Sequence, residues 1–256
     1  MTTHSSAPST HYDLKAEHYD AFNEERSRQM NQCLEVLLKH HGVHSVLDLA
    51  CGTGSQVFWL HRAGFRVAGV DINERMLQVA RQKAHQVGLS IPFSLGDMRT
   101  TQAGTFDAVI TMFNAVGHLT REDFQKAMHN IHQNLRPGGV YVFDNFNLDY
   151  LLYEDNITKF TVDWLTRNGD VQARKIQYSS ISSDGVMASY DIYHEQKGEA
   201  EPNIQTAYQT LQVYSAEQLR EMLEANGFKV VQQMDVHGGA FHKTDSERVM
   251  IVAERL

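Results

Sequence analysis

The sequence predicts an α/β protein: a doubly wound, seven-stranded sheet with an antiparallel β insertion after its fifth strand. Three observations support this fold class. Short apolar runs that end near Gly or Asp alternate with amphipathic stretches over residues 45–143, and this alternation resumes after residue 215. The segment between them shows the two-residue alternation typical of antiparallel strands. A length of 256 residues suits one domain that carries an insertion.

The elements before the insertion follow from helical spacing, apolar runs and stop signals. Apolar residues recur at helical spacing until Gly42, and again until Gly88, so a helix is expected before each glycine. Thr120, followed by Asp123 three residues later, is typical of a helix N-terminus. The expected elements are a helix at 28–41, a strand at 45–49, a helix at 55–63, a strand at 65–70, a helix at 73–87, strands at 91–95 and 106–112, a helix at 120–135, a turn at 137–139 and a strand at 140–143.

The insertion is expected as four aromatic-rich strands. Their ranges are 159–165, 171–181, 186–194 and 205–214. Asn168-Gly169 and Asp184-Gly185 are hairpin turn signals between the first three. Ser215, with Gln218 at the third position, then predicts a helix up to Asn226-Gly227, followed by strands at 228–236 and 248–253. The expected organisation is a disordered tail over 1–10, a ligand-binding domain over 11–147 and 215–256, and a substrate lid over 148–214.

Composition restricts the function classes. The formal net charge is −8, whereas surfaces that neutralise many phosphates usually carry a basic excess, so nucleic acid is an unfavourable partner. No apolar run is long enough to span a membrane, and residues 1–10 lack the apolar core of a secretory signal. The two cysteines, Cys33 and Cys51, form neither a disulfide framework nor a Cys-x-x-Cys motif. We expect a cytoplasmic protein that acts on a small molecule and has no metal.

The strongest motif is Asp48-Leu49-Ala50-Cys51-Gly52-Thr53-Gly54, which lies between an expected strand and an expected helix. Small residues there let the backbone approach a ligand, and the helix N-terminus offers free amide donors. Asp71 ends the next strand about 20 residues later, where a carboxylate can bind both ribose hydroxyls. Gly96-Asp97-Met98 follows the third strand. These strand ends meet at one edge of a parallel sheet, which predicts a nucleotide-type pocket there.

This combination resembles the class I S-adenosylmethionine-dependent methyltransferases, with a Rossmann-like sheet, from about Tyr12 to the end of the chain. Ala50 replaces the first glycine of the usual motif, as in the glycine N-methyltransferase and amino-sugar N,N-dimethyltransferase branches of this family. The resemblance implies S-adenosyl-L-methionine as cofactor and S-adenosyl-L-homocysteine as product.

The resemblance also implies cofactor-binding residues. Ala50 binds through its backbone, Asp71 holds the ribose, and Asp97 with Met98 holds adenine. Tyr12, Tyr19 and Arg28 reach the methionyl carboxylate; Arg26, two residues before Arg28, is an alternative. The full expected set is Tyr12, Tyr19, Arg28, Ala50, Gly52, Asp71, Ile72, Met76, Asp97, Met98 and Met112.

The loop after the fourth strand, residues 111–119, should border the transferred methyl group. A histidine can accept the proton that an amine loses on methylation, so His118 is the expected catalytic base. Packing within the loop is the other interpretation of His118. Asn114 either binds substrate or shapes the loop.

The insertion would supply the substrate-binding residues, for which we expect Arg174, Tyr178 and Tyr190. In glycine N-methyltransferases an arginine after the fifth strand binds the substrate carboxylate, but Phe146 occupies the matching position here. Glycine and sarcosine are therefore unfavourable substrates, although an amino-acid-like amine stays open beside an amino-sugar-like one.

The expected function is methyl transfer from S-adenosylmethionine to a small molecule, with an amine as acceptor. An O- or C-methyltransferase, a non-catalytic S-adenosylmethionine-binding protein and a dinucleotide oxidoreductase are the alternatives. A dinucleotide oxidoreductase would carry the motif Gly-x-Gly-x-x-Gly, but Val57 occupies the position of the third glycine. A homodimer paired through the insertion is possible.

Overall fold

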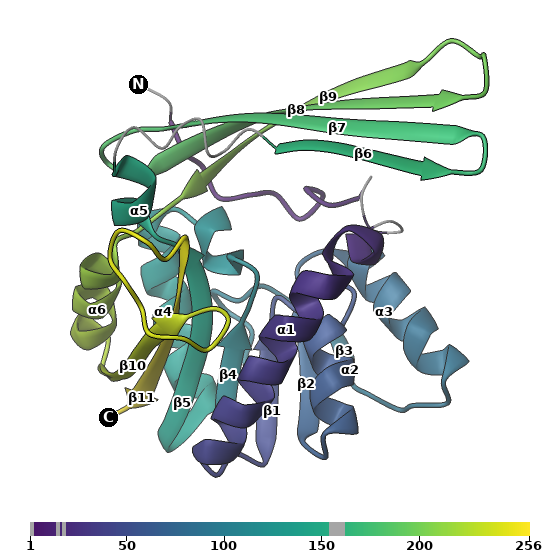
Figure 1. Cartoon of the computed structure of the whole chain (residues 1–256). Coiled ribbons are helices and arrows are strands. Elements are labelled where there is room, and N and C mark those ends of the chain that lie inside the picture. The colour runs from purple at the N-terminus through teal and green to yellow at the C-terminus, as the bar shows by residue number, and fades with distance from the viewer. Residues whose placement is uncertain (1–2, 14–15, 17–18, 154–161) are drawn as a thin grey trace.

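The structure is a computed structural model of the chain that describes residues 3–13, 16, 19–153 and 162–256, apart from the side chains of 19–26, 162 and 164. Figure 1 shows two bodies, a sheet flanked by helices and a second sheet above it. The elements are α1 (Tyr19–His40), β1 (Ser45–Leu49), α2 (Ser55–Arg62), β2 (Arg66–Asp71), α3 (Glu74–Gln86), β3 (Phe93–Leu95), β4 (Phe106–Thr111), the 3-10 helix η1 (Ala115–His118), α4 (Arg121–Asn134), β5 (Leu135–Phe146), α5 (Leu148–Leu152), β6 (Val162–Asn168), β7 (Val171–Ile181), β8 (Val186–Lys197), β9 (Asn203–Gln212), α6 (Ala216–Ala225), β10 (Phe228–Asp235) and β11 (Arg248–Arg255).

The main sheet has seven strands in the order β10-β11-β5-β4-β1-β2-β3. Strands β3, β2, β1, β4 and β5 run parallel, and β11 runs antiparallel to both of its neighbours. Strand β1 is buried along its whole length, because helices cover both faces of the sheet. The predicted α/β class and seven-stranded sheet are confirmed.

Two apolar cores lie on opposite faces of this sheet. One packs Met30 and Leu34 of α1 together with residues of α2 and α3 against the strands. The other packs Phe124 of α4 and Leu219 of α6 against the reverse face. This arrangement holds the carboxyl ends of the parallel strands in fixed relative positions, which a ligand site at that edge requires.

Strand β5 begins earlier than expected. The segment 137–139, expected as a turn, lies within the strand. The pairing with β4 passes from Phe106↔Leu135 to Ala108↔Val140, so the residues in between bulge out of register. Gly138 has φ 69°, and a Cβ at Gly139 would lie 2.8 Å from Arg136 O, so both positions of the bulge favour glycine as a turn would.

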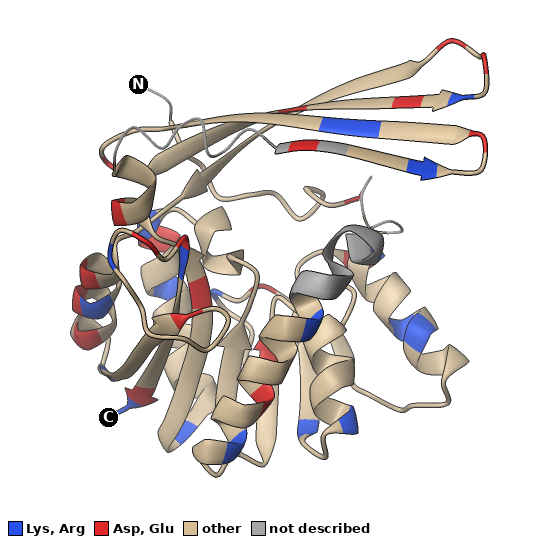
Figure 2. Ribbon diagram, in the orientation of Figure 1, with Lys and Arg blue, Asp and Glu red and all other residues tan. Residues whose placement is uncertain are grey.

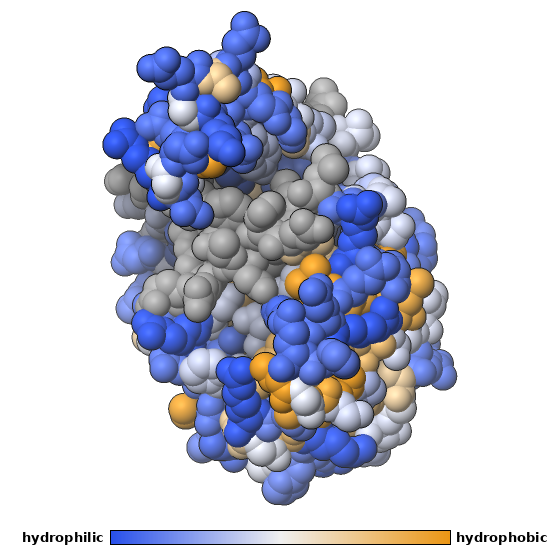
Figure 3. Space-filling view, turned by 90° about the vertical axis from the view of Figure 1, so that its right-hand side faces the viewer, coloured by the Kyte–Doolittle hydropathy of each residue, from blue (hydrophilic) through white to orange (hydrophobic). Residues whose placement is uncertain are grey.

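The insertion forms a four-stranded antiparallel sheet in the order β6-β7-β8-β9. The predicted hairpin turns are confirmed, since β6 pairs with β7 and β7 with β8 around Gly169 and Gly185, both at positive φ. This second sheet lies across the end of the main sheet at which the parallel strands terminate (Figure 1). Its hairpin ends are mainly hydrophilic in the view of Figure 3.

The N-terminal segment, residues 3–13, differs from the expected disordered tail. It runs between the two sheets (Figure 1) and hydrogen-bonds to both bodies. Ala7 N donates to His118 O at 2.9 Å, and the His4 imidazole bonds Leu119 O and Thr210 Oγ1. These partners are more than 100 residues away in sequence, so local patterns give no sign of them.

Candidate functional site

A concave pocket lies where β1, β2, β3 and β4 end, the edge at which parallel sheets of this kind bind ligands. Loops after all four strands line it, and the N-terminal segment covers it. Among the expected site residues, the pocket brings together Tyr12, Ala50, Gly52, Asp71, Ile72, Met76, Asp97, Met98, Met112 and His118. The predicted pocket edge therefore agrees with the structure.

Some expected site residues lie elsewhere. Arg28 is an exposed residue of α1 outside the pocket lining, whereas Ser27 lines the pocket. The side chain of Tyr19 lies outside the described residues, as does that of Arg26.

The loop after β1 forms a cradle that needs glycine. Gly52 and Gly54 have φ angles of 53° and 88°. A Cβ at Gly54 would lie 2.9 Å from a ring carbon of Phe58, and one at Gly52 would lie 3.2 Å from Met76 Cε. Helix α2 starts immediately after this loop without a side-chain cap, and its first residues, Ser55 and Gln56, line the pocket.

Asp71 fixes the second strand end to this loop. Its Oδ2 accepts from Gly52 N at 2.7 Å, and its Oδ1 accepts from Asn73 N at 2.8 Å. Burial raises the pKa of Asp71, and the bonds from Asn73 and Gly52 oppose that rise. Each carboxylate oxygen can accept a further bond, so the pair suits a ligand with two neighbouring hydroxyl groups.

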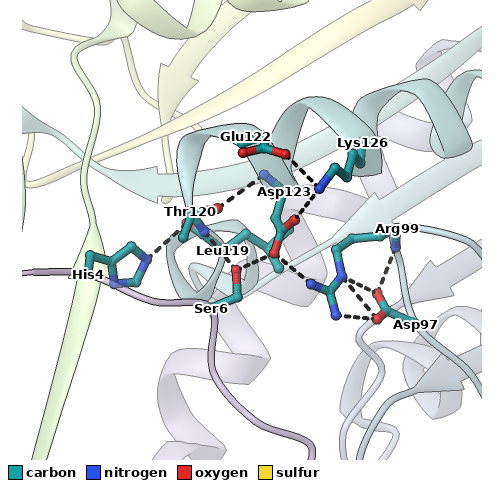
Figure 4. A network of polar contacts seen from close by, with 9 residues as sticks. All are labelled: His4, Ser6, Asp97, Arg99, Leu119, Thr120, Glu122, Asp123 and Lys126. Carbon is teal, nitrogen blue, oxygen red and sulfur yellow. Dashed lines mark hydrogen bonds and ion pairs between the residues drawn. The ribbon is translucent and has the colours of Figure 1, made fainter.

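Asp97 belongs to a chain of polar contacts that reaches the N-terminal segment (Figure 4). Arg99 donates to both oxygens of Asp97, and its Nη1 donates to Asp123 Oδ2 at 2.6 Å. Ser6 Oγ donates to the same Asp123 oxygen at 2.6 Å. Burial opposes ionisation of Asp97, but the bonds from Arg99 outweigh it and lower the pKa of this carboxyl. Asp97 is therefore an ionised acceptor at the wall of the pocket.

His118 and Tyr12 meet at the other wall. The Tyr12 hydroxyl and His118 Nε2 are 2.8 Å apart. The ring of His11 lies 5.2 Å from that of His118, and His11 Nε2 bonds Gln209 Oε1 of β9 at 3.1 Å. A titratable ring, a phenol and a side chain of the second sheet are thus joined across the pocket.

Asn114 shapes the loop. Its side chain is buried, and its Oδ1 accepts from Asn145 Nδ2 at 2.8 Å and from Phe146 N at 3.1 Å. The residue has φ 60°, a conformation that asparagine tolerates well. Because Asn114 is outside the pocket lining and its acceptor is already used, the structure favours the loop-shaping interpretation over substrate binding.

The three residues expected to bind substrate from the insertion lie on its outer face. Tyr178 pairs across strands with Tyr190, and both are more than half exposed. Arg174 lies on the same face of β7, four residues before Tyr178, and its guanidinium pairs with exposed Asp163 at 2.5 Å. None of the three lines the pocket. The expectation failed because alternation separates the two faces of a strand without telling which one points inward.

The inner face of the second sheet carries a different polar set. Ser179, Ser189 and Asp191 are buried there, and the Tyr193 hydroxyl donates to Asp191 Oδ2 at 3.0 Å. Lys175 Nζ lies 3.6 Å from Asp191 Oδ1. These residues share the parity of Gln209, which contacts His11 at the pocket, so they face the main body.

Several site residues were not predicted. His11 directly precedes Tyr12, and Arg99 directly follows Asp97-Met98, so adjacency to a recognised residue was the available signal. Nothing in the sequence indicated that Ser6, Asp123 or Gln209 belongs to the site, because their contacts there depend on the path of the N-terminal segment.

Two searches of the described residues bear on other kinds of site. No group of three or more His, Cys, Asp or Glu side chains in the described ranges could hold a metal ion. Within those same ranges, no helix has the length and apolar character needed to cross a membrane.

Comparisons with known proteins agree with this geometry. Residues 46–139 match the family model described as "Methyltransferase domain". The chain is 30% identical to the glycine N-methyltransferase of Rattus norvegicus over 182 residues, covering 60% of this chain and 62% of that protein. It is 37% identical over 102 residues to a dTDP-3-amino-3,4,6-trideoxy-alpha-D-glucopyranose N,N-dimethyltransferase of Streptomyces venezuelae, covering 39% and 41%.

A solved structure extends the likeness over nearly the whole chain. The amino pentose methyltransferase from Micromonospora echinaspora, bound to S-adenosylmethionine, superposes with a TM-score of 0.73 at 20% identity. The match covers 93% of this chain and 96% of that one, which shows a shared fold. The chain spans less than two thirds of the length of the first two relatives.

Proposed function

Because the chain belongs to the class I S-adenosylmethionine-dependent methyltransferases, we propose that it transfers a methyl group from S-adenosyl-L-methionine to an amine of a small molecule. The observation that carries this proposal is one pocket that holds a glycine cradle, two strand-end carboxylates and the Tyr12–His118 pair. A methyl donor and a proton acceptor can thus share one enclosed site.

The residues present fit the cofactor. Gly52 lines the pocket, and a Cβ there would lie 3.2 Å from Cε of Met76, another lining residue, so glycine keeps the backbone open to a ligand. A Cβ at Gly54 would instead clash with Phe58 and Phe93 of the apolar core, so this glycine shapes the loop.

Asp71 offers paired acceptors to ribose hydroxyls, and ionised Asp97 offers an acceptor to the adenine amino group. Met76 and Met112 supply apolar walls. When bound, the cofactor supplies an electrophilic methyl group on its sulfonium and leaves as S-adenosyl-L-homocysteine.

The chain's own residues would manage the proton. As the acceptor nitrogen forms its new bond to carbon, it must lose one proton. The Tyr12 hydroxyl lies 2.8 Å from His118 Nε2 and so connects the pocket to the imidazole. The proton of the amine would pass to the phenol, and the phenol proton to His118 Nε2. The N-terminal segment lines the pocket, and the second sheet lies over that end of the main sheet, an arrangement that would limit the access of bulk water.

The relatives favour an amine acceptor, and the surroundings of Phe146 disfavour glycine as that amine. The relatives named above act on glycine and on amino sugars. Phe146 stacks against Arg248, whose guanidinium pairs with buried Asp144, so that arginine is occupied and glycine recognition through it is disfavoured.

The charge distribution favours a small molecule over a nucleic acid. Figure 2 shows Lys and Arg interspersed with Asp and Glu over both bodies, without an extended basic face on the described residues seen in that view. Both cysteines are free thiols, which supports the proposed cytoplasmic location.

A matched acceptor panel tests the function. The protein is incubated with S-adenosylmethionine and with 3-amino-3-deoxyhexoses, their 3-hydroxy counterparts, glycine and sarcosine, and both S-adenosylhomocysteine and the methylated product are measured. We expect turnover with the amino sugars alone. Methylation of the hydroxy counterparts would replace the proposal with O-methylation. Tight S-adenosylhomocysteine binding without any turnover would favour a non-catalytic binding protein.

We further propose a homodimer formed through the outer face of the second sheet. Tyr178, Tyr190 and Tyr208 form one cross-strand row there, each more than half exposed. Ile192 lies in the next row on this face and Ile204 in the row after that. Four strands of about ten residues present a face of roughly 600 Å², near the 800 Å² per partner of a standard interface. Sedimentation should therefore give twice the monomer mass, and Tyr190→Glu should give the monomer mass. A monomeric wild-type protein would contradict the dimer.

A further inference from the structure

Arg99 joins two parts of the pocket that are far apart in the sequence. Its Nε lies 2.9 Å from Asp97 Oδ1 and its Nη2 lies 2.5 Å from Asp97 Oδ2. The remaining nitrogen, Nη1, lies 2.6 Å from Asp123 Oδ2 at the start of α4. One planar guanidinium therefore holds two carboxylates in fixed positions, which only an arginine can do with this geometry.

Asp123 also bonds the N-terminal segment. The oxygen that accepts from Arg99 also accepts from Ser6 Oγ at 2.6 Å, and Ser6 Oγ in turn accepts from Thr120 N at 3.0 Å. The bond from Ser6, with those from Lys126 and Arg99, lowers the pKa of Asp123 to about 2. Asp123 is therefore ionised at neutral pH, and its Oδ2 links Ser6 to Arg99 (Figure 4).

Both ends of the link lie at the same pocket. Asp97, Met98 and Arg99 line it from the end of β3, and Ala7, Pro8 and Tyr12 line it from the N-terminal segment. Ser6 itself is outside the lining. A ligand that binds Asp97 thus contacts a carboxylate that the Arg99 guanidinium orients. Arg99 in turn bonds Asp123, the residue to which Ser6 of the N-terminal segment donates.

We propose that Arg99 is a positioning residue that couples adenine recognition by Asp97 to the seating of residues 4–12 over the cofactor pocket. The proposal rests on the cofactor assignment made above. The coupling is reciprocal: the free energy by which bound adenine stabilises the contacts of residues 4–12 equals the free energy by which those contacts strengthen adenine binding. Without the guanidinium, the Asp97 carboxylate would keep only the bond from the backbone amide of residue 99, at 2.9 Å, and Asp123 would lose its link to the pocket.

Three variants and one control test this coupling. Arg99→Gln removes both links, Ser6→Ala removes only the contact to the segment, and the double variant combines them. Lys126→Ala is the control, because Lys126 bonds the other Asp123 oxygen, at 3.1 Å, and its side chain is 56% exposed. The readouts are the Kd for S-adenosylhomocysteine by calorimetry and amide hydrogen exchange at Ala7 and Thr120 with and without this ligand.

We expect Arg99→Gln to weaken S-adenosylhomocysteine binding by roughly 10- to 100-fold and Ser6→Ala by about 3- to 10-fold. The double variant should be no weaker than Arg99→Gln, since both changes break one link. Ligand-induced protection at Ala7 should be lost in both single variants, and Lys126→Ala should stay within about twofold of wild type. Arg99→Lys should restore part of the affinity, because it keeps the charge but not the paired geometry.

The pH dependence separates positioning from a general structural role. Asp71, whose pKa burial raises, is present in both proteins, so the comparison is between wild type and Arg99→Gln. In wild type Arg99 keeps the pKa of Asp97 low, so Asp97 itself should cause no loss of affinity from pH 7 to pH 5. In Arg99→Gln the bonds from the guanidinium are lost, while burial, the charge of Asp123 and the backbone amide of residue 99 still act on Asp97. The pKa of Asp97 should therefore lie higher than in wild type, and affinity should fall more steeply as pH is lowered through this range. Independent, additive losses in the two single variants, or an equal loss in Lys126→Ala, would overturn the coupling.

Two further outcomes are informative. If Arg99→Gln does not fold, Ser6→Ala still decides the question, because a residue outside the pocket must then change affinity; an unchanged Kd for Ser6→Ala overturns the proposal. If wild-type protein does not bind S-adenosylhomocysteine, the cofactor assignment fails. Non-additive melting temperatures of the same variants without ligand would then still support the link, and additive ones would exclude it.

Discussion

Replacing His118 with glutamine is expected to lower kcat by about 10²- to 10⁴-fold while leaving the Kd for S-adenosylhomocysteine within about threefold of wild type. The side chain reaches the pocket from η1, where the backbone carbonyl of His118 accepts from Ala7 N at 2.9 Å. That backbone bond survives the substitution, and glutamine can still bond the Tyr12 hydroxyl. The loss should therefore be confined to proton transfer.

Tyr12→Phe is a second variant that tests the proposed route of the proton. It keeps the ring beside His118 but removes the hydroxyl that lies 2.8 Å from Nε2. If the proton passes through the phenol, Tyr12→Phe should lose about tenfold or more in kcat, and the acid limb of kcat/KM against pH should flatten in His118→Gln. Unchanged turnover in His118→Gln would remove this residue from the mechanism, and a parallel loss of ligand affinity would make its role structural.

The pocket edge could be predicted because it depends on local rules. A buried strand, a glycine turn and a helix place Gly52 at a carboxyl end, and the same reasoning applies to Asp71 and Asp97 on the neighbouring strands. Parallel pairing then brings these ends together without any further information, since β1 lies between β4 and β2 and β3 pairs with β2. Sequence pattern therefore predicted ten of the residues that line the pocket, and their roles in cofactor binding and proton transfer are the proposal made above.

The covering parts of the site could not be predicted in the same way. Ser6 contacts Asp123 across 117 residues of sequence, and a polar, short segment shows no apolar pattern that would reveal such a contact. In the insertion the strands and turns were predicted, but Tyr178 and Tyr190 have the strand parity of the outer face. One residue of offset exchanges the two faces of a strand, and only the position of the second sheet over the first shows which is inward.

Two buried carboxyl groups below and beside the glycine loop should respond in opposite ways to the same chemical change. Asp71→Asn is expected to lower the free energy of unfolding by about 1.5–3 kcal/mol and to weaken S-adenosylhomocysteine binding by about 100-fold. Asp71 accepts from Gly52 N and Asn73 N, one on each oxygen. An asparagine amide would turn a donor toward one of these amides, which distorts the loop and removes one acceptor for the ribose.

Asp48→Asn is expected to raise the free energy of unfolding of the ligand-free protein by about 1–3 kcal/mol at pH 7.5. The Asp48 side chain is 1% exposed, and neither of its oxygens has a hydrogen-bond partner among the residues that the structure describes. Burial, and then the negative charge of Asp71, raise the pKa of Asp48 well above its ordinary value. The folded state therefore retains a proton that the unfolded chain releases.

The sign of the pH dependence follows from this retained proton. Between the ordinary pKa, near 4, and the raised pKa of the folded state, stability falls by about 1.4 kcal/mol per pH unit as pH rises, because the folded state binds more protons than the unfolded one. Asparagine has no such proton, so the advantage of Asp48→Asn should grow from about pH 4 upward until the raised pKa is passed. Urea unfolding of wild type, Asp48→Asn and Asp71→Asn at pH 5 and pH 8 measures the effect. A gain for Asp48→Asn that is equal at both pH values would show that this carboxyl is ionised in the folded protein throughout the range, held by a partner that its buried surroundings do not reveal.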